Sequence, residues 1–176
     1  MNYSVDNIHE ICEEYGIIDY TINGDGSIDV DGDVRLFDKG LTKLPIKFNH
    51  VSGNFWCYRN MLTTLVGSPK SIVGNFDCGY NKLTTLLDSP KSVGGYFLCY
   101  GNNLTTLEGG PKSVGGNFYC YRNILTTLVG SPKSIVGSFY CEYNYLTTLE
   151  GAPKSVGGNF SCGDNKLESL EGCPQS

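Results

Sequence analysis

The sequence predicts a mainly β solenoid, in which about seven coils stack a parallel β-sheet behind an N-terminal helix and hairpin. Three observations predict it: a 21-residue repeat, an alternating apolar pattern inside each repeat, and one asparagine at a fixed place in each. We expect residues 1–29 to form an N-terminal cap and residues 30–176 to form the solenoid.

The repeat is visible when the chain is written in lines of 21 residues, as in LTTLEGGPKSVGGNFYCYRNI followed by LTTLVGSPKSIVGSFYCEYNY. One earlier period, residues 30–44, has Leu36 in the cysteine place and Lys39 in the asparagine place. A period of 21 residues is typical of a solenoid and too short for a four-stranded propeller blade. Six cysteines lie 21 residues apart, each two residues after a phenylalanine and three before an asparagine: Cys57, Cys78, Cys99, Cys120, Cys141 and Cys162.

Inside each coil, the segment Val-Gly-Gly-Asn-Phe-Tyr-Cys alternates between apolar residues and others. This period of two predicts one strand whose Phe and Cys side chains are buried. A Leu-Thr-Thr-Leu segment and a Gly-Ser-Pro-Lys-Ser turn then carry the chain back. Glycine suits turns with positive φ or a close approach of two chains, and proline ends strand pairing. Identical coils stacked about 4.8 Å apart would share one core.

The asparagine of each coil has a predicted structural role. Where the chain leaves the strand, backbone groups point inward without ladder partners, and an inward amide can both donate and accept hydrogen bonds. One such residue in every coil, from Asn60 to Asn165, predicts an asparagine ladder along the solenoid.

At these positions the chain resembles the leucine-rich repeats, because the pattern Phe118-x-Cys120-x-x-Asn123-x-Leu125-x-x-Leu128 fills the places of their motif. The short coil with proline in its return segment resembles the bacterial short-repeat subclass. The segments YTINGDGSIDVDGDV and LTTLEGAPKSVGGNF are similar to small repeat proteins of tailed bacteriophages and their hosts. This resemblance covers about residues 17–176 and implies a leucine-rich-repeat-like solenoid. Phenylalanine in the place of the first leucine departs from the usual pattern.

The two ends of the array are predicted to differ. Residues 4–15 are expected to form a helix, which Ser4 caps and Gly16 ends, and Asn-Gly-Asp-Gly at residues 23–26 predicts a hairpin. The C-terminal segment NKLESLEGCPQS stops partway through a coil, so the strand around Phe160 is expected to be an open sheet edge. A homodimer through this coil is one way to cover it.

Charge and hydropathy restrict the classes of partner. A net charge of −5 and a pI of about 4.9 argue against nucleic-acid and anionic-membrane binding, which need a basic face. No apolar run approaches the roughly 20 residues of a membrane span. The N-terminal segment MNYSVDNIHE has no secretory pattern, so we expect a cytoplasmic protein, in the host cell if it is phage-encoded, with its cysteines as thiols.

Reactive residues are present but lack catalytic or metal-binding patterns. Cysteines in single file cannot converge on one zinc ion, and the two histidines, His9 and His50, have no motif partners. We therefore expect no enzyme, no metal and no cofactor, buried thiols in the repeat, and the most exposed thiol at Cys173. Two sets of charged residues suggest ligands, but each fits a solvated turn better. The acidic set, which suggests calcium, is Asp25, Asp29, Asp31 and Asp33. The basic set is a column with one lysine in each coil, which suggests a polyanion: Lys70, Lys91, Lys112, Lys133 and Lys154.

The residues that vary between coils lie beside each Phe and Cys, where the alternation turns them outward; Asp77, Asn75 and Glu142 are among them. Many are aromatic or arginine, the residue types enriched at interface hot spots. An alternative interpretation is that the tyrosines stack between coils and only strengthen the sheet. The predicted partner-binding residues are Trp56, Tyr58, Arg59, Tyr80, Tyr96, Leu98, Tyr100, Tyr119, Tyr121, Arg122, Tyr140 and Tyr143.

These observations predict a non-enzymatic protein-protein interaction module with an aromatic outer strand face. The phage resemblance implies a host protein as the partner, to be bound or inhibited. Two alternatives stay open: a structural protein that assembles through its open C-terminal sheet edge, and a binder of single-stranded nucleic acid or glycan that uses tyrosines as stacking platforms.

Overall fold

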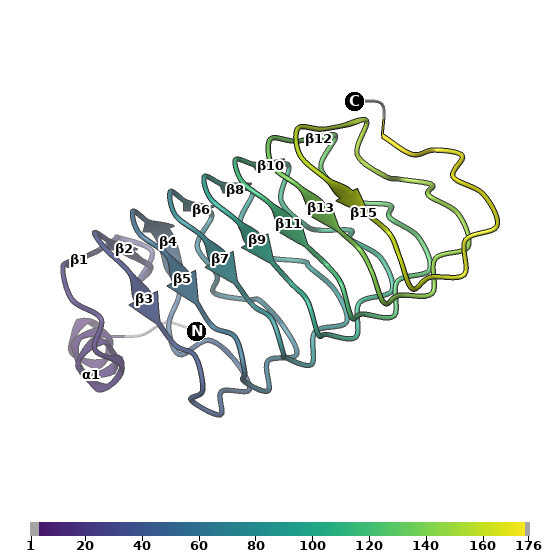
Figure 1. Cartoon of the computed structure of the whole chain (residues 1–176). Helices are drawn as coiled ribbons and strands as arrows, with labels where there is room; N and C mark the ends of the chain where they lie inside the picture. Colours follow the sequence, from purple (N-terminus) through teal and green to yellow (C-terminus); the bar gives the residue numbers. More distant parts are fainter. Residues whose placement is uncertain (1–3, 175–176) are drawn as a thin grey trace.

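The computed structural model describes residues 4–174, and it shows a chain wound into stacked coils with one short helix at the N-terminal end (Figure 1). The parts of the predicted cap and solenoid at residues 1–3 and 175–176 lie outside the described residues. Helix α1 (Val5–Tyr15) leads into the hairpin of β1 (Tyr20–Ile22) and β2 (Ile28–Val30). The strands that follow are β3 (Val34–Arg35), β4 (Phe48–Val51), β5 (Phe55–Trp56), β6 (Ser71–Ile72), β7 (Phe76–Asp77), β8 (Ser92–Val93), β9 (Phe97–Leu98), β10 (Ser113–Val114), β11 (Phe118–Tyr119), β12 (Ser134–Ile135), β13 (Phe139–Tyr140), β14 (Ser155–Val156) and β15 (Phe160–Ser161).

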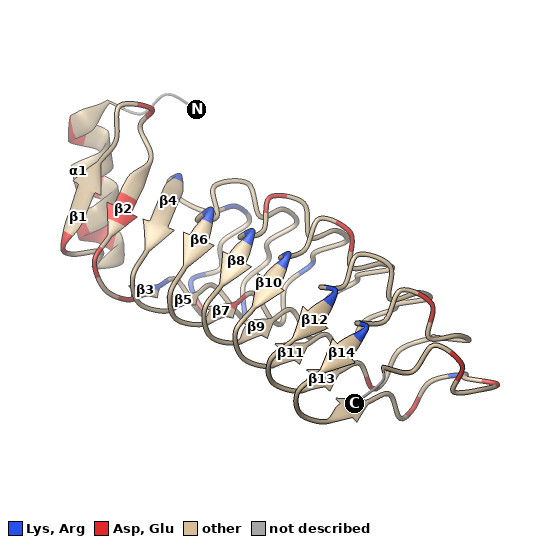
Figure 2. Ribbon diagram, turned by 90° about the horizontal axis from the view of Figure 1, so that it is seen from above, with Lys and Arg blue, Asp and Glu red and all other residues tan. Residues whose placement is uncertain are grey.

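The coils build three sheets of mainly parallel strands, which confirms the predicted parallel β solenoid. One sheet, here called the Phe sheet, is parallel and has seven strands: β3, β5, β7, β9, β11, β13 and β15. In it each phenylalanine pairs with its repeat equivalent. The second sheet, here called the Ser sheet, joins β1, β2, β4, β6, β8 and β10, and β12 pairs separately with β14. Basic residues lie at the starts of β4, β6, β8 and β10 of this sheet and at the starts of β12 and β14 (Figure 2).

The prediction of one continuous strand per coil is wrong. The segment Val-Gly-Gly-Asn-Phe-Tyr-Cys splits at its glycines, so that Ser113–Val114 and Phe118–Tyr119 belong to different sheets. The second position of this bend is glycine in every coil, and a side chain there has no room: a Cβ added to Gly74 would lie 2.6 Å from the carbonyl oxygen of Gly53 in the preceding coil. Glycine therefore permits the close approach that turns the chain from one sheet into the other.

The core is a column of identical side chains. The phenylalanine rings from Phe55 to Phe160 follow one another with centroids 5.1–5.6 Å apart. The repeat cysteines from Cys57 to Cys141 are fully buried free thiols, and burial raises their pKa above the ordinary value. Cys173 is exposed, as predicted. The buried thiols thus act as small core residues.

The predicted asparagine ladder is confirmed, and Asn102 shows its geometry. Its side-chain oxygen accepts the N–H of Leu83 at 3.1 Å, and its Nδ2 donates to the carbonyl oxygens of Cys78 at 3.1 Å, Cys99 at 3.1 Å and Tyr100 at 3.3 Å. Two of these partners belong to the preceding coil and two to its own. The same set recurs along the array to Asn165, so each amide ties two coils together.

The predicted N-terminal helix and hairpin are present next to the first coil. Ser4 accepts the N–H of Asn7 to begin α1, and Gly16, with a φ of 64°, ends it. Ile8 and Cys12 of the helix are buried in the core cluster. Strand β1 pairs antiparallel with β2, and β2 continues into the solenoid through parallel pairing with β4.

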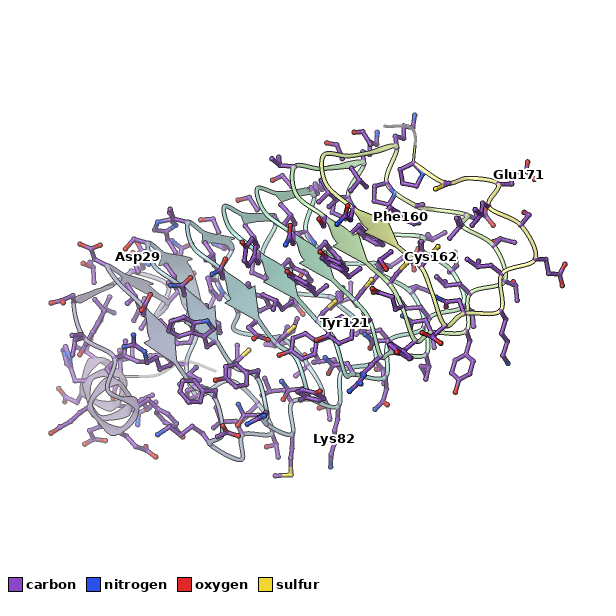
Figure 3. The ribbon with its side chains drawn as sticks, in the orientation of Figure 1. Asp29, Lys82, Tyr121, Phe160, Cys162 and Glu171 are labelled. Atoms are coloured by element: carbon purple, nitrogen blue, oxygen red, sulfur yellow. The ribbon has the colours of Figure 1, made fainter. Side chains whose placement is uncertain are left out.

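At the other end of the Phe sheet, β15 is an edge strand in the part of the chain that the structure describes. Phe160 and Cys162 of this coil (Figure 3) are only partly buried. Leu170 is 66% exposed. The prediction of an open edge is confirmed. A homodimer through this coil stays a prediction.

Replacing Asn102 with leucine removes an amide that serves four buried backbone groups. We expect this variant to lose about 3 kcal/mol or more of unfolding free energy, because each unpaired buried group costs about 1–3 kcal/mol. Urea unfolding followed by circular dichroism measures the loss. The matched control is Asn165→Leu in the last coil, where the asparagine is half-buried and water can replace its bonds. Equal losses for the two variants would contradict the buried-ladder explanation.

Candidate partner-binding face

The predicted contact residues lie together on the outer side of the Phe sheet and along the corner that follows it; Tyr121 marks this side in Figure 3. Trp56, Leu98, Tyr119 and Tyr140 occupy the second position of their strands. We call the twelve predicted residues the tyrosine face.

Eight members of the tyrosine face lie outside the strands to which the sequence assigned them, and four of these stand at the corner that precedes the ladder asparagine. Arg59, Tyr80, Arg122 and Tyr143 have left-handed backbones, with φ between 50° and 54°. This conformation is uncommon for bulky residues. It turns the chain so that the next residue, the ladder asparagine, points into the core. The side chains at this corner project outward as a result, and Tyr80 and Tyr143 are 42% and 54% exposed.

The tyrosine rings stack on one another, as the alternative interpretation expects. Tyr119 and Tyr140 are parallel with centroids 4.8 Å apart, and Tyr100 and Tyr121 with centroids 4.9 Å apart. The two pairs meet edge to face through Tyr119 and Tyr121. Stacking occupies the ring faces at the centre of this surface, and it leaves ring edges and the corner side chains to solvent.

A hollow of about 340 Å³ opens within the tyrosine face. Glu142, which is not among the predicted contacts, contributes a buried Oε2 that has no hydrogen-bond partner in the described structure. It is the one acidic residue directly after a repeat cysteine, and this was the available sequence signal. The hollow is lined by Glu142 and six predicted residues: Tyr80, Tyr119, Tyr121, Arg122, Tyr140 and Tyr143.

The polar groups around the hollow are neutral hydroxyls and two opposite charges. Burial raises the pKa of Tyr121, and that of Tyr100 beside it, so both hydroxyls stay protonated at neutral pH. Arg122 lies over the ring of Tyr143, with its guanidinium carbon 5.6 Å from the centroid. The hollow therefore offers hydroxyl donors, one guanidinium and one unpaired carboxylate oxygen.

Two groups of residues predicted to face outward have structural roles instead. In the column before each Phe, asparagine oxygens accept backbone N–H groups of the next coil, as Asn75 does from Tyr96 at 2.7 Å. Asp77 is only 8% exposed, because Gly79 has no side chain and the ring of Tyr100 lies in the space that a Cβ would need. Asp77 accepts the N–H of Gly79 at 2.9 Å. Desolvation raises its pKa to about 6.

The aspartates that suggested calcium are held by separate partners in the structure, whereas the lysine column is in register, with the N–H of Lys91 donating to the carbonyl oxygen of Lys70 at 2.9 Å. Asp25 forms an ion pair with Lys47, with a carboxylate oxygen 2.6 Å from Nζ. Asp29 accepts a hydrogen bond from Nδ2 of Asn49 at 2.7 Å. Asp33 accepts the N–H of Asn54 at 2.8 Å. Among residues 4–174, no three His, Cys, Asp or Glu side chains gather in a geometry that could hold a metal ion.

Comparisons with known proteins add no relatives: no family model, no curated protein and no solved structure matches the chain. The function is therefore inferred from the geometry of the face itself. Within the described residues, no helix is long and apolar enough to span a membrane.

Asp77→Asn should make stability less dependent on pH. The pKa of folded Asp77, about 6, lies above the ordinary value of 3.8, so the folded chain holds this proton more tightly than the unfolded chain. The wild type therefore loses stability as pH rises from about 4 to about 6, by up to about 3 kcal/mol, and does not regain it above pH 6. Asparagine keeps the acceptor for Gly79 and carries no charge.

Urea unfolding of Asp77→Asn at pH 4, 5, 6 and 7 tests this expectation. The variant should match the wild type near pH 4 and exceed it at pH 7. Asp164→Asn, at an exposed carboxylate in the last coil, controls for the loss of one negative charge. A variant that is less stable than the wild type at pH 7 would contradict the assignment.

Proposed function

We propose that this chain is a non-enzymatic protein-interaction module that holds a protein partner on its tyrosine face. One observation carries the proposal: six predicted contact residues surround a hollow in which the buried Glu142 Oε2 has no partner. A buried acceptor without a donor costs free energy in the isolated chain. A bound partner that supplies the donor removes this cost.

The geometry favours a protein over single-stranded nucleic acid or glycan. Bases and sugar rings bind tyrosine through free ring faces. The central rings Tyr100, Tyr119, Tyr121 and Tyr140 already lie face to face in pairs. Glu142 and the net charge of −5 repel phosphates.

The hollow fits a partner side chain that donates hydrogen bonds. Lysine and arginine are the donors whose charge also complements Glu142, and their apolar stems can pack against tyrosine rings. Arg122, on the same hollow, offers donors to a carbonyl or carboxylate of the partner. We therefore propose a partner with a basic side chain at the centre of its contact surface, which the acidic chain attracts at long range.

The resemblance to phage repeat proteins supports a host protein as this partner and the host cytoplasm as the place where they meet. Binding by a rigid, preformed face is compatible with inhibition, because the solenoid covers whatever surface it holds.

A second candidate function, assembly through the C-terminal coil, rests on the open edge at β15 and the exposure of Leu170. If a second copy covers this edge, sedimentation velocity will show dimers that increase with concentration. Leu170→Asp should then shift the population to monomer, whereas Tyr143→Ser should leave it unchanged. Monomer alone at high concentration would remove this function.

The binding proposal is tested by affinity capture with four baits: wild type, Glu142→Gln, Tyr143→Ser and Tyr145→Ser. Tyr145 is the matched control, because it is 49% exposed and lies outside the hollow. A true partner is retained by the wild type and by Tyr145→Ser and is depleted with the other two. With the purified partner, Glu142→Gln should weaken calorimetric affinity by at least about tenfold. If all four baits retain the same proteins equally, the tyrosine face is not the site.

A further inference from the structure

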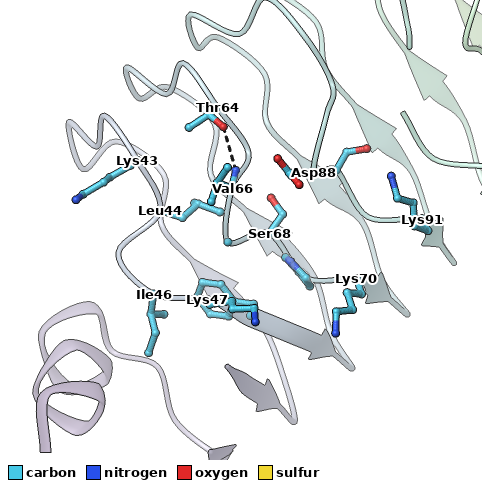
Figure 4. A pocket seen from close by; sticks show the side chains of 14 residues that line it. Lys43, Leu44, Ile46, Lys47, Thr64, Val66, Ser68, Lys70, Asp88 and Lys91 are labelled. Atoms are coloured by element: carbon cyan, nitrogen blue, oxygen red, sulfur yellow. Dashed lines mark hydrogen bonds between the residues drawn. The ribbon is translucent and has the colours of Figure 1, made fainter. Parts of the chain in front are cut away.

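A second and larger hollow lies near the N-terminal end of the solenoid, away from the tyrosine face. It has a volume of about 590 Å³ and lies between the return segments of successive early coils and strand β4 (Figure 4). Leu44, Ile46, Phe48, Val66 and Pro69 supply apolar lining. We call this hollow the lysine groove. Its volume falls within the range of about 300–1,000 Å³ that is typical of sites for small organic ligands.

The charged residues of the lysine groove are mostly of one sign. Lys43, Lys47, Lys70 and Lys91 line it together with a single acid, Asp88. Lys47 forms an ion pair with Asp25, a residue that does not line the groove, and its Nζ lies 2.6 Å from the carboxylate oxygen. Lys70 and Lys91 stand at the starts of neighbouring strands β6 and β8. In a chain of net charge −5, this groove is a local concentration of positive charge beside apolar surface.

Ser68 in the lysine groove differs from its repeat equivalents. Ser89 Oγ donates to the carbonyl oxygen of Gly109 in the next coil at 3.0 Å, and Ser131 Oγ donates in the same way to that of Gly151. Ser68 is 8% exposed, and its Oγ is buried without a hydrogen-bond partner in the described structure.

The difference has a local cause in the next coil. Gly109, which supplies the acceptor for Ser89, has a φ of 84°. The equivalent residue in the coil after Ser68 is Asp88, whose φ is 65°. The repeat therefore provides a hydrogen bond for Ser89 and leaves the Ser68 hydroxyl unused. Ser68 and Asp88 both line the groove. A buried hydroxyl without a partner is a place where a ligand atom can complete the hydrogen bonding.

We infer that the lysine groove binds a small organic anion, with its apolar body on the Leu44, Ile46 and Phe48 side and its acidic head beside Lys70 and Lys91. The Ser68 hydroxyl donates to an oxygen of the same ligand. Both parts of the ligand follow from the lining: apolar surface accounts for the body, and the excess of lysine accounts for the acid. A long polyanion is disfavoured, because only two members of the lysine column, Lys70 and Lys91, line the groove. This site is independent of the tyrosine face.

Two fluorescent probes of matched shape test the inference. 8-Anilinonaphthalene-1-sulfonate has an apolar body and one anionic group, and N-phenyl-1-naphthylamine is the same body without it. The purified chain should bind the sulfonate saturably with one site, and the neutral probe at least about tenfold more weakly, as expected for the loss of the charged contacts. Equal affinities, or no saturable binding, would overturn the inference.

Variants locate the site, and the repeat supplies matched controls. The double variant Lys70→Gln, Lys91→Gln should weaken sulfonate binding by about tenfold. The double variant Lys133→Gln, Lys154→Gln removes two lysines of the same column far from the groove and should leave the affinity unchanged. Equal weakening by the two double variants would show a general charge effect and would contradict the site.

Ser68→Ala separates a ligand-binding role from a structural one. It should weaken sulfonate binding by about two- to tenfold and should not lower the urea midpoint, because the hydroxyl makes no internal bond and its removal relieves an unpaired buried group. Ser89→Ala should lower the midpoint, because it removes the bond to Gly109. If Ser68→Ala lowers the midpoint as much as Ser89→Ala and leaves probe binding unaffected, the role of Ser68 in binding is disproved.

Discussion

The asparagine ladder is the constraint on which the rest of the structure depends. Each amide must point into the core to satisfy the backbone of its own coil and of the coil before it. The chain can aim it there only if the residue before it adopts a left-handed backbone, which projects that residue's side chain outward. The exposed corner of the tyrosine face, with Tyr80, Arg122 and Tyr143, is thus a consequence of how the core is closed.

A regular repeat also shows where the chain departs from its own rules. Most buried polar atoms recur with the same partner in coil after coil. In the described residues, two buried side-chain oxygens lack partners, Ser68 Oγ and Glu142 Oε2, and Ser68 and Glu142 each line one of the two hollows described above. Because the equivalents Ser89 and Ser131 are satisfied, the state of Ser68 is not imposed by the fold. Both hollows therefore combine a shape that can hold a ligand with an unmet hydrogen bond.

The two sites differ in chemistry and in the class of partner they suit. The tyrosine face is broad and shallow, with its ring faces occupied by one another, and it suits a surface that inserts a donor side chain. The lysine groove is more apolar and carries positive charge, which suits a small acid. Stacked coils allow both, because residues on the Phe sheet can change without altering the return segments on the other side.

The sequence by itself determined the period, the buried Phe and Cys columns, the asparagine ladder, the helix and hairpin of the cap and the exposure of Cys173. These features either repeat along the sequence or are signalled by neighbouring residues, so no contact between side chains of different coils is needed to derive them. The tertiary structure alone decided the split of each predicted strand at Gly116 and its equivalents, the burial of Asp77 under Tyr100, and the unpaired oxygens of Glu142 and Ser68. Each of these depends on which side chain the neighbouring coil, 21 residues away, places against it. Alternation along one strand cannot reveal that contact, because it arises only when successive coils are stacked.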